Sequence, residues 1–176
     1  MVKVITRICN ILSTVILVAV IGIVGVLLAP RIFGYNALAV LSGSMEPVYH
    51  VGSVVYVKND VAPEEIQIGD PIAFYRSDGM VATHRVTAVN TDNRQFTTKG
   101  DNNNVEDKAP VSFDKLIGRA GKSIPLLGYL IVNIKTKKGM IAAAGLLVFV
   151  ILLYIIPEIM KPEKASAKPE GESKEE

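Results

Sequence analysis

Two long apolar runs without charged residues lie near the two ends of the chain. The first covers Ile8 to Pro30 and the second covers Gly139 to Pro157. A helix that crosses the hydrocarbon core of a bilayer needs roughly 20 predominantly apolar residues, with a range of about 17 to 25. Both runs reach this length. The pattern therefore predicts two transmembrane helices and excludes a fully soluble or fully disordered chain.

The segment between the two runs shows β patterns. Short runs of β-branched and aromatic residues are separated by turn residues such as Gly69-Asp70-Pro71 and Ser77-Asp78-Gly79, which favour chain reversal. Strands joined by such short loops pair antiparallel. The strands expected on this basis are Val54–Val57, Ile72–Tyr75, Val81–Val89 and Gln95–Thr98. No helix of useful length is expected between the two runs.

One further apolar stretch, Ile124 to Ile134, is too short to span a membrane. It is interrupted by Pro125 and Gly128, which disfavour regular structure. The stretch could pack on the sheet or lie against the membrane. Because it leads directly into the second apolar run, we expect membrane contact.

The first apolar run is predicted to be a permanent anchor. A removable leader has an apolar core of about 7 to 15 residues, followed by a small-x-small cleavage site. The run from Ile8 is longer, and the small residue at its far end, Ala29, is followed by Pro30. Proline lacks the backbone N–H and fixes φ, which makes this bond a poor protease substrate.

Basic residues give the orientation of the first helix. Lys3, Arg7 and the amino terminus precede it, whereas Arg31 alone follows closely. The positive-inside rule therefore places the N-terminus in the cytoplasm. Lysines flank the second run on both sides and do not discriminate. Two spans return the C-terminus to the cytoplasm, so we expect a multi-pass protein of the cell (cytoplasmic) membrane with its middle domain on the exterior face.

The predicted fold class is mostly β, with a small antiparallel β domain between two transmembrane helices. The tail is rich in Lys, Glu, Pro and Ser and cannot bury enough apolar surface to become ordered. The predicted parts are an N-terminal stub and anchor (1–30), an exterior β domain (31–138), a second transmembrane helix (139–157) and a disordered cytoplasmic tail (158–176).

Composition and charge exclude two further classes. The formal net charge is only +2, with 19 basic and 17 acidic residues, and no concentrated basic face indicates nucleic-acid binding. The chain has one cysteine, Cys9, so no intrachain disulfide can form. The exterior domain must be held together by burial and backbone pairing.

Several residues in the middle segment could carry chemistry. The turn Ser42-Gly43-Ser44-Met45-Glu46-Pro47 can expose a hydroxyl. A nucleophilic serine also needs a base within hydrogen-bond reach and donors for an oxyanion. His84 lies in the best strand pattern, His50 lies in a loop, and a lysine is the other possible base. Asp101 and Asp107, six residues apart, could orient an imidazole.

Each of these signals alone has an ordinary structural explanation. The serine turn is by default a polar turn, and His84 is by default a strand histidine with satisfied hydrogen bonds. Asp101 lies in a Gly-Asp-Asn-Asn run typical of turns, and Asp107 is by default a solvated acid. Their joint occurrence, in one β domain beside a membrane anchor, favours a catalytic site.

The motifs resemble those of type I signal peptidases of the archaeal and endoplasmic-reticulum branch. They are Ser-Gly-Ser-Met-x-Pro from Ser42, His-Arg-Val from His84, and Lys-Gly-Asp-Asn-Asn from Lys99 with a second aspartate six residues after the first. The similarity covers most of Ala37 to Leu127. In the bacterial branch a lysine occupies the position of His84, so the histidine assigns the branch.

The resemblance implies a role for each candidate residue. Ser44 would be the nucleophile, His84 the general base and Asp107 the acid that orients His84. Asp101 would be needed for activity or for shaping the site. The Ser42 hydroxyl would join the Ser44 backbone N–H in the oxyanion hole.

The resemblance also implies the activity. A membrane-bound serine endopeptidase of this family removes signal peptides from exported preproteins by cleaving after a small residue. Its partners would be secretory preproteins, the lipid bilayer and other subunits of the export machinery or of a complex, and it would need no metal or organic cofactor. We expect the extended substrate to add as a strand to a sheet edge.

Two other classes remain open on the residues alone. A non-catalytic membrane protein with a small exterior β module, serving as scaffold or binding partner, would show the same spans and strands, but would not need Ser44, His84 and Asp107 together. A soluble self-cleaving repressor of similar β fold would use a Ser-Lys pair. The apolar run from Ile8 and the presence of His84 both argue against the repressor.

Overall fold

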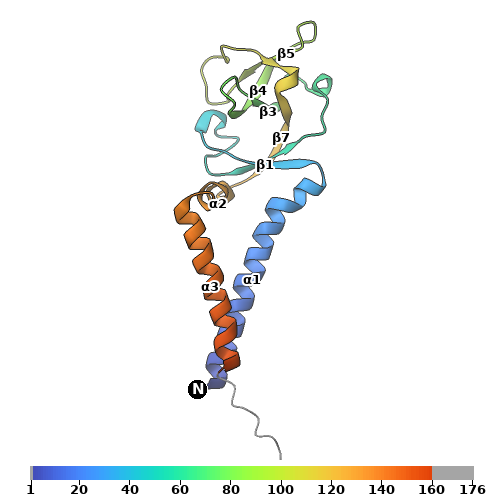
Figure 1. The fold of residues 1–176 in the computed structure, drawn as a ribbon. Coiled ribbons are helices and arrows are strands. Elements are labelled where there is room, and N and C mark those ends of the chain that lie inside the picture. The colour runs from blue at the N-terminus through green and yellow to red at the C-terminus, as the bar shows by residue number, and fades with distance from the viewer. Residues whose placement is uncertain (1, 160–176) are drawn as a thin grey trace, which may run out of the picture. The chain divides into compact units, whose positions relative to one another are not determined.

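The structure is a computed structural model that describes residues 2–159 (Figure 1). The chain forms two compact units. One contains the N-terminal part of α1 up to Val20 together with α3 from Ala144 on, and the other contains Ile21 to Ala143, including the whole sheet. The predicted tail falls outside the described residues from 160 on.

The two apolar runs form the long helices α1 (Val2–Ile32) and α3 (Lys137–Ile159). Both are long and apolar enough to cross a membrane. Their large apolar side chains are mostly exposed, as Leu17 and Leu147 illustrate, which indicates that these faces do not belong to a protein core.

Seven strands between these helices form one sheet in which every pairing is antiparallel. The spatial order is β1-β2-β7-β3-β4-β5-β6. The predicted fold class, an antiparallel β domain between two long apolar helices, is confirmed. The strands are β1 (Tyr35–Ala39), β2 (Val54–Lys58), β3 (Pro71–Tyr75), β4 (Val81–Asn90), β5 (Gln95–Lys99), β6 (Val111–Ser112) and β7 (Leu116–Ile124).

The four predicted strands are β2 to β5, and three others were not predicted. Strand β7 lies inside the sheet between β2 and β3, yet Gly118 and Gly121 interrupt its apolar pattern. Gly118 is required by crowding, since a Cβ there would lie 2.0 Å from the carbonyl oxygen of Lys58. Strand β1 is short and weakly patterned, and β6 has only two residues.

Two apolar clusters stabilise the sheet. The first surrounds Phe96, which stacks on Phe113 with ring centroids 4.4 Å apart. The second contains Met45 and Tyr49 together with residues of β2, β3 and β7. Because Met45 follows Ser44 directly, burial of its side chain fixes the serine turn to the sheet.

A short helix of eight residues lies between the apolar runs, where no helix of useful length was expected. Helix α2 (Leu127–Ile134) follows β7 and packs closely on the chain that precedes β2. The backbone N–H of Gly128 donates to the carbonyl of Gly52 at 2.9 Å, and a Cβ on Gly128 would lie 2.3 Å from the carbonyl oxygen of Ser53. The glycine that looks like a helix breaker in the sequence therefore permits this contact.

Part of α2 is not covered by the protein. Tyr129, Leu130 and Ile134 keep about half of their surface exposed. The predicted membrane contact of this stretch therefore stays a prediction, alongside its observed packing on the β domain.

Candidate active site

Buried side chains fix the turn that carries Ser44 to the sheet, and its other side faces the surface. It forms a single 3₁₀ turn, η1 (Gly43–Met45). Met45 and Tyr49 are buried, and the Tyr49 hydroxyl donates to the carbonyl of Gly121 in β7 at 2.8 Å. This anchoring leaves the half-buried Ser44 at the surface of the domain.

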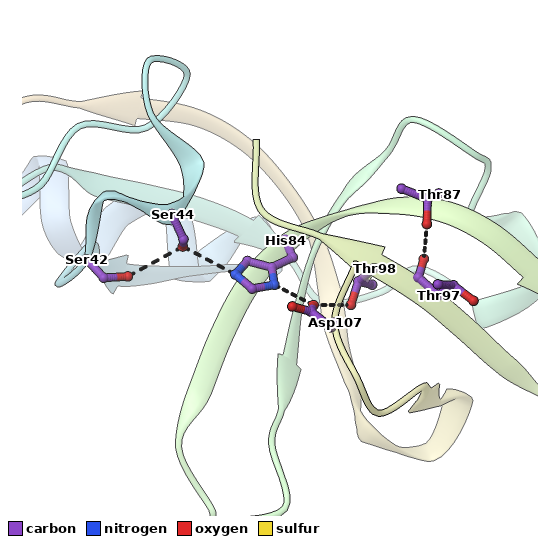
Figure 2. Close-up of polar contacts among 7 residues, drawn as sticks. All are labelled: Ser42, Ser44, His84, Thr87, Thr97, Thr98 and Asp107. Atoms are coloured by element: carbon purple, nitrogen blue, oxygen red, sulfur yellow. Dashed lines mark hydrogen bonds and ion pairs between the residues drawn. The ribbon is translucent and has the colours of Figure 1, made fainter. Parts of the chain in front are cut away.

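Ser44, His84 and Asp107 lie in a row, as Figure 2 shows. The Oγ of Ser44 is 3.2 Å from Nε2 of His84, and Nδ1 of the same ring is 2.5 Å from Oδ2 of Asp107. A carboxylate at Nδ1 favours the tautomer whose proton is on that nitrogen, which leaves Nε2 free to accept from the serine hydroxyl. The His84 side chain is only 13% exposed, so the ring is held rather than solvated.

Other residues hold the ring and the acid in place. The hydroxyl of Thr98, a fully buried residue of β5, donates to Oδ2 of Asp107 at 2.6 Å (Figure 2). The backbone N–H of Asp107 donates to the Thr98 carbonyl at 2.8 Å. Phe74 packs its ring edge-on against the imidazole at 6.2 Å between centroids. Sequence reasoning missed Thr98, although its place just before the Lys-Gly-Asp motif was a usable signal.

The two predicted carboxylates have different partners. Only Asp107 contacts the imidazole. Asp101 binds the guanidinium of Arg85 through two hydrogen bonds of 2.7 and 2.6 Å. Of the two acids that could orient an imidazole, Asp107 lies at the ring and Asp101 does not. Since neighbouring residues of a strand point to opposite faces, His84 and Arg85 each take one acid from the same loop.

The Arg85–Asp101 ion pair lies close to Tyr49, the buried residue that anchors the serine turn. Arg85 also donates to the carbonyl of Gly69 at 2.7 Å. The hydrogen bonds that Arg85 donates to Asp101 raise the pKa of Arg85, which keeps the guanidinium charged. Burial raises the pKa of Tyr49, and the nearby Arg85 partly offsets this, so Tyr49 stays a neutral hydrogen-bond donor.

The loop of residues 100–103 packs closely on the main chain of the serine turn and donates hydrogen bonds to it. The N–H of Asn102 donates to the Ser44 carbonyl at 2.9 Å, and the Asn102 side-chain amide donates to the Gly43 carbonyl at 3.2 Å. A Cβ on Gly100 would lie 2.6 Å from the carbonyl oxygen of Ser44. This approach is possible only for glycine.

The remaining candidates lie at different distances from the row. The hydroxyl of Ser42 is 3.4 Å from that of Ser44 (Figure 2), on the exposed side of the turn. His50 is 62% exposed, and its Nδ1 lies 3.9 Å from Glu46, so it is not part of the row. Within residues 2–159, no group of three or more His, Cys, Asp and Glu side chains is placed to hold a metal ion.

A groove of about 540 Å³ opens beside Ser44, and we call it the substrate groove. One wall is the segment Leu38–Ser42, and the other is Val81–His84 of β4. Residues 81–84 pair with β3 on one edge, whereas β5 pairs with β4 only from Arg85 onward. The other edge of this part of β4 is therefore free of strand pairing within the described residues.

The known proteins to which the chain is similar are named as signal peptidases or as their catalytic subunits. The chain is 45% identical over 85 residues to signal peptidase I W of Bacillus subtilis, a match that covers 47% of this chain and 45% of that protein. It is 34% identical over 132 residues to the signal peptidase complex catalytic subunit SEC11 of Yarrowia lipolytica, covering 64% of this chain and 73% of the relative. The putative human SEC11B is 34% identical over 105 residues, covering 53% and 62%.

The extent of these matches differs. The chain matches less than two thirds of the length of the Bacillus and human relatives, and more than two thirds of the Yarrowia protein. No family model matches the chain. Together with two helices long and apolar enough to cross a bilayer, the relatives indicate a membrane-associated peptidase. By its similarity to SEC11, the chain belongs to the type I signal peptidases, in the branch of the SEC11 catalytic subunits.

Proposed function

We propose that the chain is a membrane-bound serine endopeptidase that removes N-terminal signal peptides from exported preproteins by cleaving after a small residue. The observation that carries this proposal is the row of Ser44, His84 and Asp107 at the edge of the substrate groove. A nucleophile within reach of a base, and a base oriented by a third group, is the arrangement that acyl transfer needs.

The proposed mechanism follows from this geometry. His84 accepts the hydroxyl proton of Ser44 through Nε2 as Oγ attacks the carbonyl carbon of the substrate, and Asp107 stabilises the resulting imidazolium. His84 then donates that proton to the leaving amine as the peptide bond breaks and the acyl-enzyme forms. Water then attacks the ester as His84 takes its proton, and His84 returns this proton to Oγ of Ser44 as the ester bond breaks and the product with its new carboxyl terminus leaves.

The oxyanion of each tetrahedral intermediate needs hydrogen-bond donors. We assign this role to the backbone N–H of Ser44 and the hydroxyl of Ser42, whose position 3.4 Å from the nucleophile supports the assignment. Asp101 would act indirectly, because its partner is Arg85 and its loop grips the serine turn.

The free edge of β4 supports a binding mode for the substrate. An extended peptide adding to residues 81–84 would satisfy that edge with backbone hydrogen bonds, while the groove selects side chains at alternate positions. Small wall residues such as Ala39 and Ala82 leave shallow space there. A membrane anchor would add proximity, because a signal peptide in the same bilayer is already near the site.

We further propose a multi-pass protein of the cell membrane, with its N-terminus and tail in the cytoplasm and its β domain on the exterior face. Lys3 and Arg7, at the start of α1 and before its uncharged apolar run, support this orientation. The names of two relatives, which are catalytic subunits of a signal peptidase complex, support other subunits as partners. The proposed parts of the chain are the stub and anchor (1–30), the exterior β domain (31–138), the second transmembrane helix (139–157) and the cytoplasmic tail (158–176).

The first prediction concerns the nucleophile. Ser44→Ala should lower kcat/KM for a synthetic preprotein by about a thousandfold or more, because the covalent route is lost. The thermal unfolding midpoint in detergent should stay near the wild-type value, since the turn is anchored by Met45 and Tyr49 rather than by the Ser44 hydroxyl. Ser123→Ala, in β7, is the matched control and should cleave normally. Wild-type processing by Ser44→Ala would contradict the serine mechanism, whereas an absence of cleavage by the wild-type chain would favour a non-catalytic module.

The second prediction separates a histidine base from a lysine base. His84→Lys should lose nearly all cleavage, since a flexible cation would replace a ring oriented by Asp107. Lys99→Ala should retain most of it. Initial rates of the two variants and of His84→Ala, measured on one preprotein, make the comparison. An inactive Lys99→Ala beside an active His84→Ala would identify a Ser-Lys enzyme instead.

The third prediction concerns orientation. In a Cys9→Ser background, a membrane-impermeant thiol reagent should label Asp92→Cys, in the turn between β4 and β5, only in right-side-out vesicles. It should label Ser173→Cys, in the tail, only in inside-out vesicles. Detergent should make both sites reactive and serves as the control. The reverse labelling pattern would mean that the β domain faces the cytoplasm.

A further inference from the structure

A second groove, of about 330 Å³, lies next to the substrate groove. The two share lining from Arg76, Ala82 and His84. The second groove continues past Asp107 to Lys108 and Lys115, and we call it the basic groove. Its volume lies within the range of small-ligand sites. The imidazole of His84 therefore lies between two neighbouring grooves.

The basic groove carries an excess of positive charge. Lys108 and Lys115 are exposed, and neither forms an ion pair with any described residue. Arg76 is paired with Asp78 at 3.2 Å. Asp107 is an acid of the lining, and its carboxylate is already bound by His84 and Thr98. Two lysines are thus left to attract an anionic group.

The chemistry of peptide cleavage indicates which part of the substrate lies on the side of the basic groove. Ser42 and Ser44 line the substrate groove, whereas Asp107 lines the basic groove, and Figure 2 shows these residues in a row with His84 between them. The base that accepts the serine proton must return it to the leaving amine. The amine, and the chain that follows it, must therefore lie on the histidine side of Ser44.

We infer that the basic groove receives the first residues of the mature chain, those that follow the cleaved bond, and favours acidic side chains among them. This inference rests on the proposed function. A peptide carboxylate is favoured over a lipid phosphate because the groove starts at the proposed general base and shares lining with the substrate groove. Lys108 and Lys115 are then specificity-determining residues.

Three preproteins with the same signal peptide and cleavage site test this inference. They differ only at the second and third residues after the cleaved bond, which are Glu-Glu, Gln-Gln or Lys-Lys. The full chain is assayed in neutral detergent, and the quantity compared is the ratio of kcat/KM for the Glu-Glu and Lys-Lys substrates. A ratio within one enzyme cancels any general loss of activity or folded protein.

The wild-type ratio should be about tenfold, as expected for two exposed charge pairs gained in one case and lost in the other. It should shrink with added salt because exposed charges are screened. Lys108→Glu/Lys115→Glu should reverse the preference. Should that variant fail to fold, Lys108→Gln/Lys115→Gln should bring the ratio close to one. Lys58→Glu/Lys122→Glu, with the same change in net charge outside both grooves, should keep the wild-type ratio.

Other outcomes overturn the inference. A wild-type ratio near one, or an equal shift in both Glu double variants, would show that the groove does not read substrate charge. Rates that respond to anionic lipid vesicles but not to peptide charge would assign the lysines to a lipid. In each case Ser44-dependent cleavage of the Gln-Gln substrate leaves the proposed function standing, whereas failure to cleave it would contradict the proposed function itself.

Discussion

The contact between the backbone of Gly100 and the carbonyl of Ser44 is the constraint on which the proposed site depends. The serine turn and the acid-bearing loop are far apart in sequence, and each is short. They meet where any side chain at position 100 would come within 2.6 Å of the Ser44 oxygen. Asn102 then uses its N–H to satisfy the same carbonyl at 2.9 Å. These main-chain contacts help to set the position of the serine without using its hydroxyl, which faces Nε2 of His84.

The acid-bearing loop is held on both faces of β4. His84 and Arg85 are neighbours whose side chains point to opposite faces; His84 contacts Asp107, and Arg85 binds Asp101 through two charge-assisted hydrogen bonds. Such bidentate pairs are geometrically specific. One pair would orient the proposed base, and the other fixes the loop that grips the serine turn. This division gives the two aspartates different physical functions, although they lie only six residues apart.

Much of the fold could be predicted because burial leaves a clear pattern. Apolar runs long enough to span a bilayer and alternating runs such as Val81–Val89 identify helices and strands directly. Strand β7 escaped because Gly118, which close approach requires, interrupts its pattern. Helix α2 escaped because Gly128 looks like a breaker, whereas its missing side chain permits docking. In both cases glycine is required by close contact with a segment that is distant in sequence, and the local sequence pattern contains no sign of that contact.

The candidate site divides in the same way. Residue types and their order indicate Ser44, His84 and two acids, but spacing alone does not tell which acid meets the imidazole, since the loop folds back over β4. The support from Thr98 and Arg85 depends on strand pairing and was missed.

The most direct test of the account replaces Gly100 by alanine. Gly121→Ala in β7 is the control, because a Cβ at position 121 meets only an ordinary contact of 3.4 Å. Displacing the serine by a few tenths of an ångström to 1 Å should lower kcat by about a hundredfold with the sheet still folded, whereas wild-type kcat in Gly100→Ala would contradict the account.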